Sequence, residues 1–246
     1  MSEQRTVFAI TGADRIGFLQ GLVTNDVSDL GGGLTYAALL SPQGKYLFDF
    51  FLFQRGETVF LDVMAAAAQP LVNRLALYKL RADVEIKEAN LKVSRGVGEM
   101  PAQAMSDPRH PALGWRYYDQ QLLDLAPVDW MHIRVENLIP ETGIELISGE
   151  SYILEMGFER LSGVDFRKGC YVGQEVTARM KHKTELKKGL AMVVISGKGT
   201  QGAEITDDGK TIGWLHTISG NRAIAYLRFG RATAKMKSGA AVLSVI

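Results

Sequence analysis

The sequence contains a single cysteine, Cys170, among its 246 residues. A lone thiol cannot close an intramolecular disulfide, and it cannot by itself fill a zinc or iron–sulfur site, because such sites take about four ligands. It can act as a nucleophile, as a redox-labile thiolate, or as one ligand in a site that another molecule completes. Cysteine poverty also suits a reducing compartment.

The sequence also lacks a charge imbalance, a long apolar run, a targeting pattern and a metal-binding spacing. Lysine and arginine (28) nearly balance aspartate and glutamate (27), so no global basic field predicts non-specific binding of nucleic acid. Apolar runs are interrupted by charge before they reach membrane-spanning length. The first five residues show no apolar or arginine-rich targeting pattern, so we expect a soluble, cytoplasmic protein. No metal-binding spacing joins the four scattered histidines, His110, His132, His182 and His216.

The neighbours of Cys170 favour a reactive thiol. Lys168 and Arg167 precede it, glycines flank it, and residues 174–180 are predicted to form a helix. A thiol beside a lysine and just before a helix N-terminus is expected to have a lowered pKa. The alternative is a small, buried, apolar cysteine, since free cysteine is among the most buried residue types.

Hydrophobic periodicity predicts an α+β fold without regular βαβ alternation. Strands are expected over 6–11, 34–40, 45–53, 58–63, 82–87 and 91–97, and helices just after 12–14 and over 69–80 and 127–138. Pro70 is placed in the first turn of its helix, and residues 100–111 are expected to be loop. From about residue 185 the pattern alternates over 190–196, 211–219 and 222–229, which predicts a small antiparallel β-barrel.

The segment Lys168-Gly169-Cys170-Tyr171-Val172-Gly173-Gln174-Glu175 matches the Lys-Gly-Cys-Tyr-x-Gly-Gln-Glu signature of the YgfZ-type folate-binding proteins. Residues 12–27, residues 41–45 with Asp49, and residues 163–166 extend the resemblance over most of the chain. These proteins assist the maturation of certain iron–sulfur enzymes and, in bacteria, are linked to tRNA modification. They are relatives of the glycine-cleavage T-protein, an aminomethyltransferase.

The resemblance implies a T-protein-like folate-binding region over residues 1–184 and a C-terminal β-barrel domain over 185–246. The resemblance further implies that the protein's cofactor is tetrahydrofolate or a one-carbon derivative. It implies partners among iron–sulfur assembly proteins or client iron–sulfur enzymes, with no direct contact to nucleic acid or membrane. Cys170 and Lys168 are the predicted catalytic residues. The residues predicted to bind folate are Asn25, Asp26, Asp49, Arg134, Tyr171, Gln174, Glu175 and Arg179.

Several of these residues have plainer interpretations. A carboxylate in an apolar pocket suits the N–H and NH2 edge of a pterin, and Asp49 could provide it or could simply face solvent. Asp26 could cap local backbone, and Glu175 could only favour the first turn of its helix. Arg134 and Glu136 could be pocket residues or a surface pair. The basic residues within 179–183 and 187–188 could form a solvated helix end, an anion site for a folate glutamate tail or, less favoured, an RNA contact.

Three functions follow as alternatives. The first is a folate-binding iron–sulfur maturation factor, in which Cys170 attacks a folate-bound one-carbon unit or acts transiently on a cluster or partner thiol. The second is a tetrahydrofolate-dependent aminomethyltransferase, against which the chain is short. The third is a non-catalytic scaffold that uses folate structurally.

Overall fold

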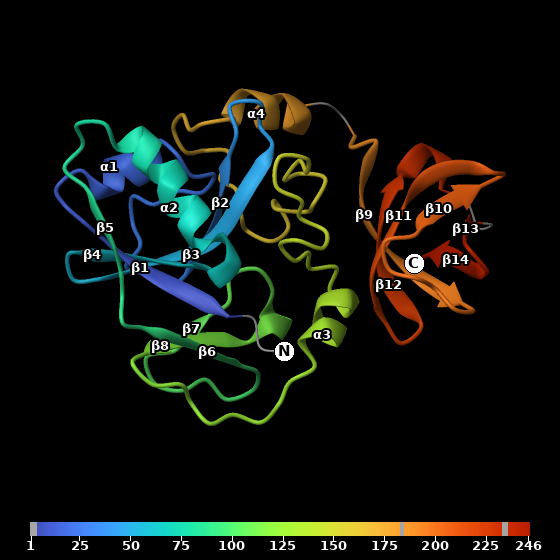
Figure 1. The fold of residues 1–246 in the computed structure, drawn as a ribbon, viewed down its shortest axis with the longest axis horizontal. Coiled ribbons are helices and arrows are strands. Elements are labelled where there is room, and N and C mark those ends of the chain that lie inside the picture. Colours follow the sequence, from blue (N-terminus) through green and yellow to red (C-terminus); the bar gives the residue numbers. More distant parts are fainter. Residues whose placement is uncertain (1–3, 183–184, 233–235) are drawn as a thin grey trace. The chain divides into compact units, whose positions relative to one another are not determined.

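The computed structural model describes residues 4–182, 185–232 and 236–246. Two compact units make up the chain (Figure 1). The first contains Met1–Val128 and Glu159–Gln174, and the second contains Asp129–Phe158 and Glu175–Ile246. The chain therefore leaves each unit and returns to it. Residues 129–158 group with the barrel, whose first strand begins close to the boundary expected at residue 185.

The first unit is built on a five-stranded antiparallel sheet with the strand order β2-β3-β4-β1-β5. Sequence neighbours β2 and β3, and then β3 and β4, pair as hairpins because short turns connect antiparallel strands. The strands are β1 (Arg5–Thr11), β2 (Thr35–Leu40), β3 (Tyr46–Arg55), β4 (Thr58–Met64) and β5 (Glu85–Glu88).

Two helices, α1 (Arg15–Gln20) and α2 (Ala65–Lys79), pack on one face of this sheet. Leu19 of α1 and Leu71 and Leu75 of α2 enter the same apolar core as Phe50 and Leu52 of β3. Leu71 and Leu75 are four residues apart, and this spacing places them on one side of α2. Burial of this core is the main apolar contribution to the stability of the unit.

The opposite face of the sheet carries a smaller three-stranded sheet with the order β6-β8-β7. Its strands are β6 (Lys92–Gly96), β7 (Met105–Ser106) and β8 (Trp115–Asp119). Since successive strand residues face opposite sides, Phe51 and Phe53 lie on this face. The Tyr118 ring lies 4.4 Å from the Phe53 ring, and the Arg116 guanidinium lies 3.9 Å from the centre of the Phe51 ring.

A fully buried carboxylate, Asp62, holds these layers together. It accepts hydrogen bonds from Arg5 at 2.6 Å, Tyr118 at 2.8 Å and Arg116 at 3.3 Å. A buried charge is tolerated only when such partners surround it. The network therefore requires β4, β1 and β8 to keep their mutual register.

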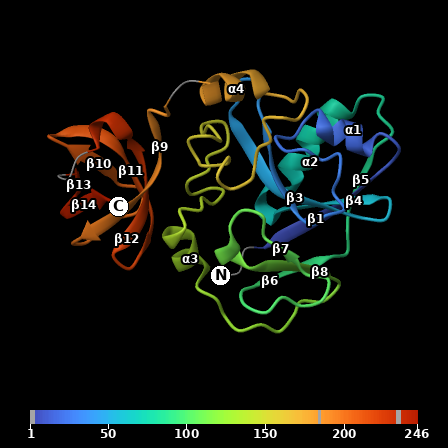
Figure 2. The same cartoon turned by 180° about the vertical axis from the view of Figure 1, so that it is seen from behind.

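The second unit contains a closed antiparallel barrel with the strand order β10-β11-β12-β9-β14-β13 (Figure 2). Its interior is filled by alternating apolar side chains such as Val193, Leu215, Ala225 and Leu227. The strands are β9 (Lys188–Ser196), β10 (Glu204–Asp207), β11 (Lys210–Ser219), β12 (Arg222–Arg228), β13 (Met236–Ser238) and β14 (Ala241–Val245). Helix α3 (Trp130–Glu136) packs on β11 and β12, and α4 spans Gln174–His182.

The predicted α+β class and the C-terminal antiparallel barrel are confirmed. Two local predictions are wrong. Helix α2 begins at Ala65, so Pro70 lies inside the helix and not in its first turn, because the preceding alanines extend the helix. Strand β7 lies in the segment expected to be loop, where Met105 and Ser106 pair with β8. Among the described residues, no helix is long and apolar enough to cross a membrane.

Candidate functional site

The sole thiol is displayed at the surface by a loop whose neighbouring residues are buried. Cys170 and Gly169 are exposed, whereas Lys168 and Tyr171 on either side are only 8% and 7% exposed. The interpretation of Cys170 as a small buried apolar residue is therefore wrong. The predicted helix after this loop is confirmed, since α4 begins at Gln174, whose side-chain amide lies 3.5 Å from the Gly169 carbonyl.

Lys168 anchors the loop through its buried amino group. Its amino group donates hydrogen bonds to three backbone carbonyls, that of Gln20 at the end of α1 (3.0 Å) and those of Val23 (2.6 Å) and Asn25 (2.7 Å) in the segment that follows. Burial lowers the pKa of Lys168 to about 8, while the carboxylate of Asp26 opposes this shift. Below that pH the ammonium carries three protons, one for each carbonyl.

This geometry assigns Lys168 a positioning role before any other. Its donors point to the chain after α1, and its amino group lies 5.2 Å from the centre of the Tyr171 ring. A cation over an aromatic face is stabilised by the ring's electron-rich surface. Lys168 and Tyr171 thus support each other on both sides of Cys170. Activation of the thiol by Lys168 stays a prediction.

The chain just before the loop is tied to the same segment. The Thr24 hydroxyl donates to the Gly163 carbonyl at 2.6 Å, and the Asp165 N–H donates to the Thr24 carbonyl at 3.0 Å. The Asn25 amide donates to the Ser162 carbonyl at 2.7 Å and to the Tyr36 carbonyl at 2.8 Å. Thr24 and Asn25 therefore join the loop to β2, although the sequence separation exceeds 130 residues.

A glycine fixes the other end of the loop. Gly173 has φ +83°, and a Cβ there would lie 2.6 Å from the Ser41 carbonyl oxygen in the β2–β3 turn. Only glycine permits this conformation and this close approach. Gly169 differs, because its φ is not in the left-handed region and a Cβ there would have no atom within 4 Å.

Asp26 acts locally, as its plainer interpretation predicts. Its carboxylate accepts hydrogen bonds from the Ser28 N–H and from the Gln20 amide, both at 3.0 Å. The hydrogen bonds from Ser28 are the main reason that the pKa of Asp26 is lowered. Whether Asp26 also contacts folate stays a prediction.

Asp49 lies between two phenols on the sheet. Its carboxylate accepts hydrogen bonds from Tyr46 at 2.6 Å and from Tyr36 at 2.9 Å. Both tyrosine rings are buried, whereas Asp49 is partly exposed. Burial, followed by the nearby Asp49 charge, raises the pKa of Tyr36 well above its usual value, so this phenol stays a donor. The sequence did not identify these tyrosines, because neither the β2–β3 pairing that brings Tyr36 to Asp49 nor the irregularity of that pairing near Tyr46 is visible locally.

The remaining predicted folate residues belong to the second unit. Arg134 is buried and engaged by the Glu145 carboxylate (2.7 Å), the Ile139 carbonyl (3.1 Å) and Glu141. Its expected neighbour Glu136 pairs instead with Arg222, so Arg134 and Glu136 do not form a surface pair with each other. Glu175 and Arg179 are exposed in the first and last turns of α4. Within its own unit, Arg134 is thus paired with the buried carboxylate of Glu145 and the partly exposed carboxylate of Glu141.

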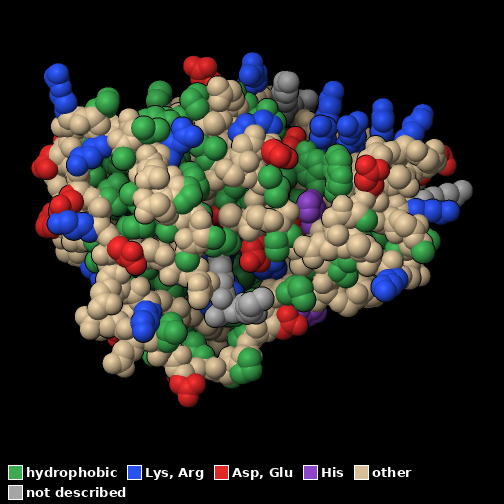
Figure 3. Space-filling view, viewed as in Figure 1, with side chains coloured by type: hydrophobic (Ala, Val, Ile, Leu, Met, Phe, Trp, Pro, Cys, Tyr) green, Lys and Arg blue, Asp and Glu red, His purple; other side chains and the backbone are tan. Residues whose placement is uncertain are grey.

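Basic side chains gather over the barrel, where Figure 3 shows a row of lysine and arginine residues. In the same unit, a groove of about 630 Å3 is lined by Lys187, Lys188, Arg228 and Arg231, with Glu185 as its acidic member. Part of the predicted basic segment, Lys183, lies outside the described residues. Within the described part of the chain, no group of three or more histidine, cysteine, aspartate or glutamate side chains could hold a metal ion.

Comparison with known proteins agrees with this architecture. Residues 187–246 match the family model "CAF17, C-terminal beta-barrel domain". The solved structure of glycine cleavage system aminomethyltransferase T from Bartonella henselae superposes with a TM-score of 0.78, covering 99% of this chain and 83% of that one, at 14% sequence identity. The chain therefore has the T-protein fold, as predicted; at this identity the likeness concerns fold alone.

The sequence is also similar to proteins named iron–sulfur cluster assembly factor IBA57 or its homologue, mitochondrial. The Neurospora crassa homologue is 32% identical, with 83% of this chain and 55% of that protein covered. The Mycosarcoma maydis homologue is 30% identical, with 75% and 54% covered. The human protein is 29% identical, with 91% and 75% covered. The chain spans about half the length of the two fungal relatives.

These names support the iron–sulfur part of the resemblance, while a YgfZ-type identity stays a prediction. They also correct the predicted location. Each of these relatives is named as mitochondrial, which contradicts the cytoplasmic location that we expected.

Replacing Lys168 with methionine should destabilise the first unit by about 3 kcal/mol, because one buried and two partly buried carbonyls lose their charged donor. Arg167→Met removes an adjacent cation whose side chain is 93% exposed and should change stability by less than about 0.5 kcal/mol. The free energy of unfolding of the first unit is measured by urea unfolding, followed by Trp115 fluorescence. The two tryptophans of the other unit are replaced by phenylalanine for this purpose. Equal effects of the two variants would contradict the anchoring role.

Gly173→Ala should destabilise the same unit by about 1–3 kcal/mol, because the added Cβ collides with the Ser41 carbonyl in a left-handed conformation. Gly169→Ala, four residues earlier, should be nearly neutral, since open space surrounds that position. The same urea-unfolding assay compares the free energies of unfolding of the two variants. A neutral Gly173→Ala variant would show that the loop does not depend on close contact with the turn.

Proposed function

We propose that this chain is an iron–sulfur cluster assembly factor of the kind for which its relatives are named, and that Cys170 is its working group. The similarity to those proteins supports the first part. One observation carries the second. The sole cysteine of the chain is exposed on a loop of the first unit, and contacts within that unit hold its neighbours Lys168, Tyr171 and Gly173.

The chemistry proposed for Cys170 is transient ligation of iron in a cluster that another protein carries. The cluster is cargo here, and a single thiolate supplies one of its roughly four ligands. A sulfur–iron bond forms, one ligand of the carrier is displaced, and the thiol proton passes to water, so no electron is transferred. The remaining ligands would come from the carrier protein.

Tetrahydrofolate, or a one-carbon derivative, is proposed as the cofactor of the first unit. The residues fit its chemistry at one point: the Asp49 carboxylate is partly exposed and held in place by Tyr36 and Tyr46. Such a carboxylate can accept the paired N–H donors of a pterin edge. Bound folate would supply a one-carbon carrier, and this chain's part would be to orient it through Asp49.

Replacing Cys170 with serine should abolish function while leaving the fold intact, because the side chain is exposed and the replacement is nearly isosteric. In cells that lack the protein, Cys170→Ser should leave iron–sulfur enzyme activity at the level of the empty vector. Gly169→Ala changes the same exposed loop and should restore full activity. Full activity of Cys170→Ser would overturn the thiol mechanism and favour a scaffold.

Anaerobic calorimetry with tetrahydrofolate tests the cofactor separately. Wild type and Cys170→Ser should bind with equal affinity, whereas Asp49→Asn should bind about tenfold more weakly because a charge-assisted hydrogen bond is lost. Asp124→Asn, which changes an exposed aspartate, is the matched control. Absence of binding to wild type would contradict the folate proposal, and methylene transfer by the purified protein would favour an aminomethyltransferase.

A further inference from the structure

The part of the barrel where β9 begins and β12 ends carries a cluster of cations that the proposed function does not use. Strand register places Lys188 of β9 directly opposite Arg228 of β12. Side chains alternate along both strands, and the neighbouring Leu227 lies in the barrel interior, so Lys188 and Arg228 point outward. Like charges directly opposite each other on paired strands repel and destabilise the pairing. An anion bound beside them would remove this repulsion.

Two further cations complete the cluster. Lys187 precedes β9, and Arg231 ends the short 3-10 helix Phe229–Arg231 that follows β12. The Phe229 N–H donates to the Lys187 carbonyl at 3.0 Å and ties the two ends together. All four cations line the groove of about 630 Å3, where Glu185 is the one acidic residue among the described lining residues. In the part of the chain that the structure describes, none of the four forms an ion pair.

The same groove also presents apolar surface. Phe229 and Leu186 line it and are 41% and 36% exposed. The Phe229 ring lies against the backbone of Gly189, where an added Cβ would be 3.1 Å from a ring carbon. Glycine at this position of β9 therefore leaves room for the ring. Unbalanced positive charge and an exposed aromatic ring thus occur together in one groove.

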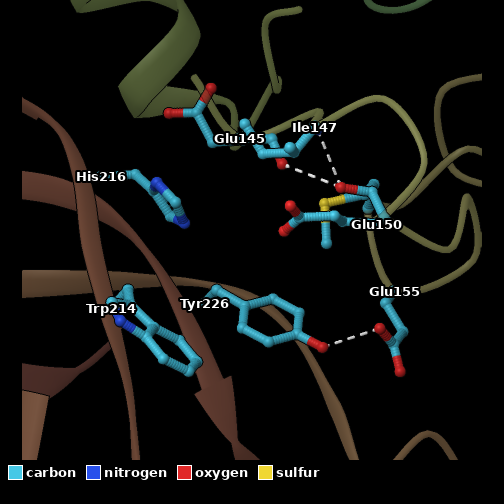
Figure 4. Close-up of a pocket in the computed structure, with 9 residues that line it drawn as sticks. Glu145, Ile147, Glu150, Glu155, Trp214, His216 and Tyr226 are labelled. Carbon is cyan, nitrogen blue, oxygen red and sulfur yellow. Dashed lines mark hydrogen bonds between the residues drawn. The ribbon is translucent and has the colours of Figure 1, made fainter. Parts of the chain in front are cut away.

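The strands that form this groove are held from outside the barrel. The segment from Glu145 to Glu155 covers part of the barrel's outer surface, and the buried Glu145 carboxylate accepts the Thr217 hydroxyl at 2.5 Å. Figure 4 shows the Tyr226 hydroxyl of β12 donating to the Glu155 carboxylate, at 2.7 Å. The Leu190 N–H of β9 donates to the Glu155 carbonyl at 3.0 Å. These bonds fix β9 and β12 next to the cations, so the groove is preorganised.

We propose that this groove binds an acidic segment of a partner protein, in which carboxylate side chains flank an apolar one. Four cations against one acidic residue leave an excess of positive charge that complements several carboxylates. Leu186 and Phe229 provide the contact for the apolar side chain. The positive excess is local, since lysine and arginine (28) nearly balance aspartate and glutamate (27) over the whole chain. A short acidic segment fits such a groove better than an extended polyanion such as RNA.

Calorimetry on the full chain at low salt tests the assignment with four probes. The first is the capped peptide Asp-Glu-Leu-Glu-Phe-Asp, and the second is its uncharged analogue Asn-Gln-Leu-Gln-Phe-Asn. Tri-γ-glutamate carries carboxylates without apolar side chains and represents a folate tail, and hexa-adenylate represents RNA. The acidic peptide should bind with a Kd of about 0.1 mM, and each of the other three at least about tenfold more weakly.

Variants locate the site. Lys188→Gln and Arg231→Gln should each weaken binding of the acidic peptide about threefold, because each removes one surface ion pair. Lys198→Gln removes an exposed lysine of the same unit that does not line the groove, and it should leave binding unchanged. Amide hydrogen exchange in β9 and β12 should be unchanged or slower in Lys188→Gln, because its repulsion with Arg228 is lost. Weaker binding by this variant is thereby distinguished from loss of structure.

Four results would overturn the proposal. They are absence of saturable binding of the acidic peptide, equal affinity for its uncharged analogue, tighter binding of tri-γ-glutamate or hexa-adenylate, and unchanged binding by both groove variants. The measurements need neither a cluster nor folate, so they succeed or fail independently of the proposed function.

Discussion

The display of Cys170 depends on one buried ammonium group. Lys168 donates to three carbonyls of a segment that lies more than 140 residues earlier in the chain. Backbone carbonyls need partners when they are buried, and three of them converging on one point leave room for a single cation. The loop is therefore defined by the chain after α1 as much as by its own residues. Thr24, Asn25 and Gly173 reinforce that attachment from either end.

Each unit also contains a buried carboxylate surrounded by donors, Asp62 in the first and Glu145 in the second. Such groups add little net stability compared with well-packed apolar side chains, because desolvation offsets much of the attraction. Their effect is on specificity: a shifted strand would leave a buried charge without partners. Asp62 constrains β8 against the main sheet, and Glu145 constrains the segment that covers the barrel.

Local patterns in the sequence were sufficient for the hairpin of β2 and β3, for the barrel strands β9, β11 and β12, and for the helix after Cys170. They did not reveal the shorter barrel strands β10, β13 and β14. They were also sufficient to single out Cys170, because composition and a contiguous motif do not depend on tertiary structure. The direction of Lys168 was not predictable, since its acceptors are backbone atoms of a distant segment. Tyr36 was missed for a related reason, because only the pairing of β2 with β3 brings it to Asp49. Tyr46 precedes Asp49 by three residues on β3, where regular alternation would place the two on opposite faces; the β2–β3 pairing is irregular at this point. The start of α2 before Pro70 reflects helix-forming alanines that apolar periodicity does not reveal.

The isolation of Cys170 has a practical consequence for spectroscopy. An exposed thiol that is unique in the chain accepts a maleimide fluorophore or a nitroxide spin label without prior removal of other cysteines. The label would sit on a loop whose flanking residues are anchored, so its rotational freedom would report the environment of the sulfur and not general backbone motion. Approach of another protein to this loop would then appear directly as a change in label mobility.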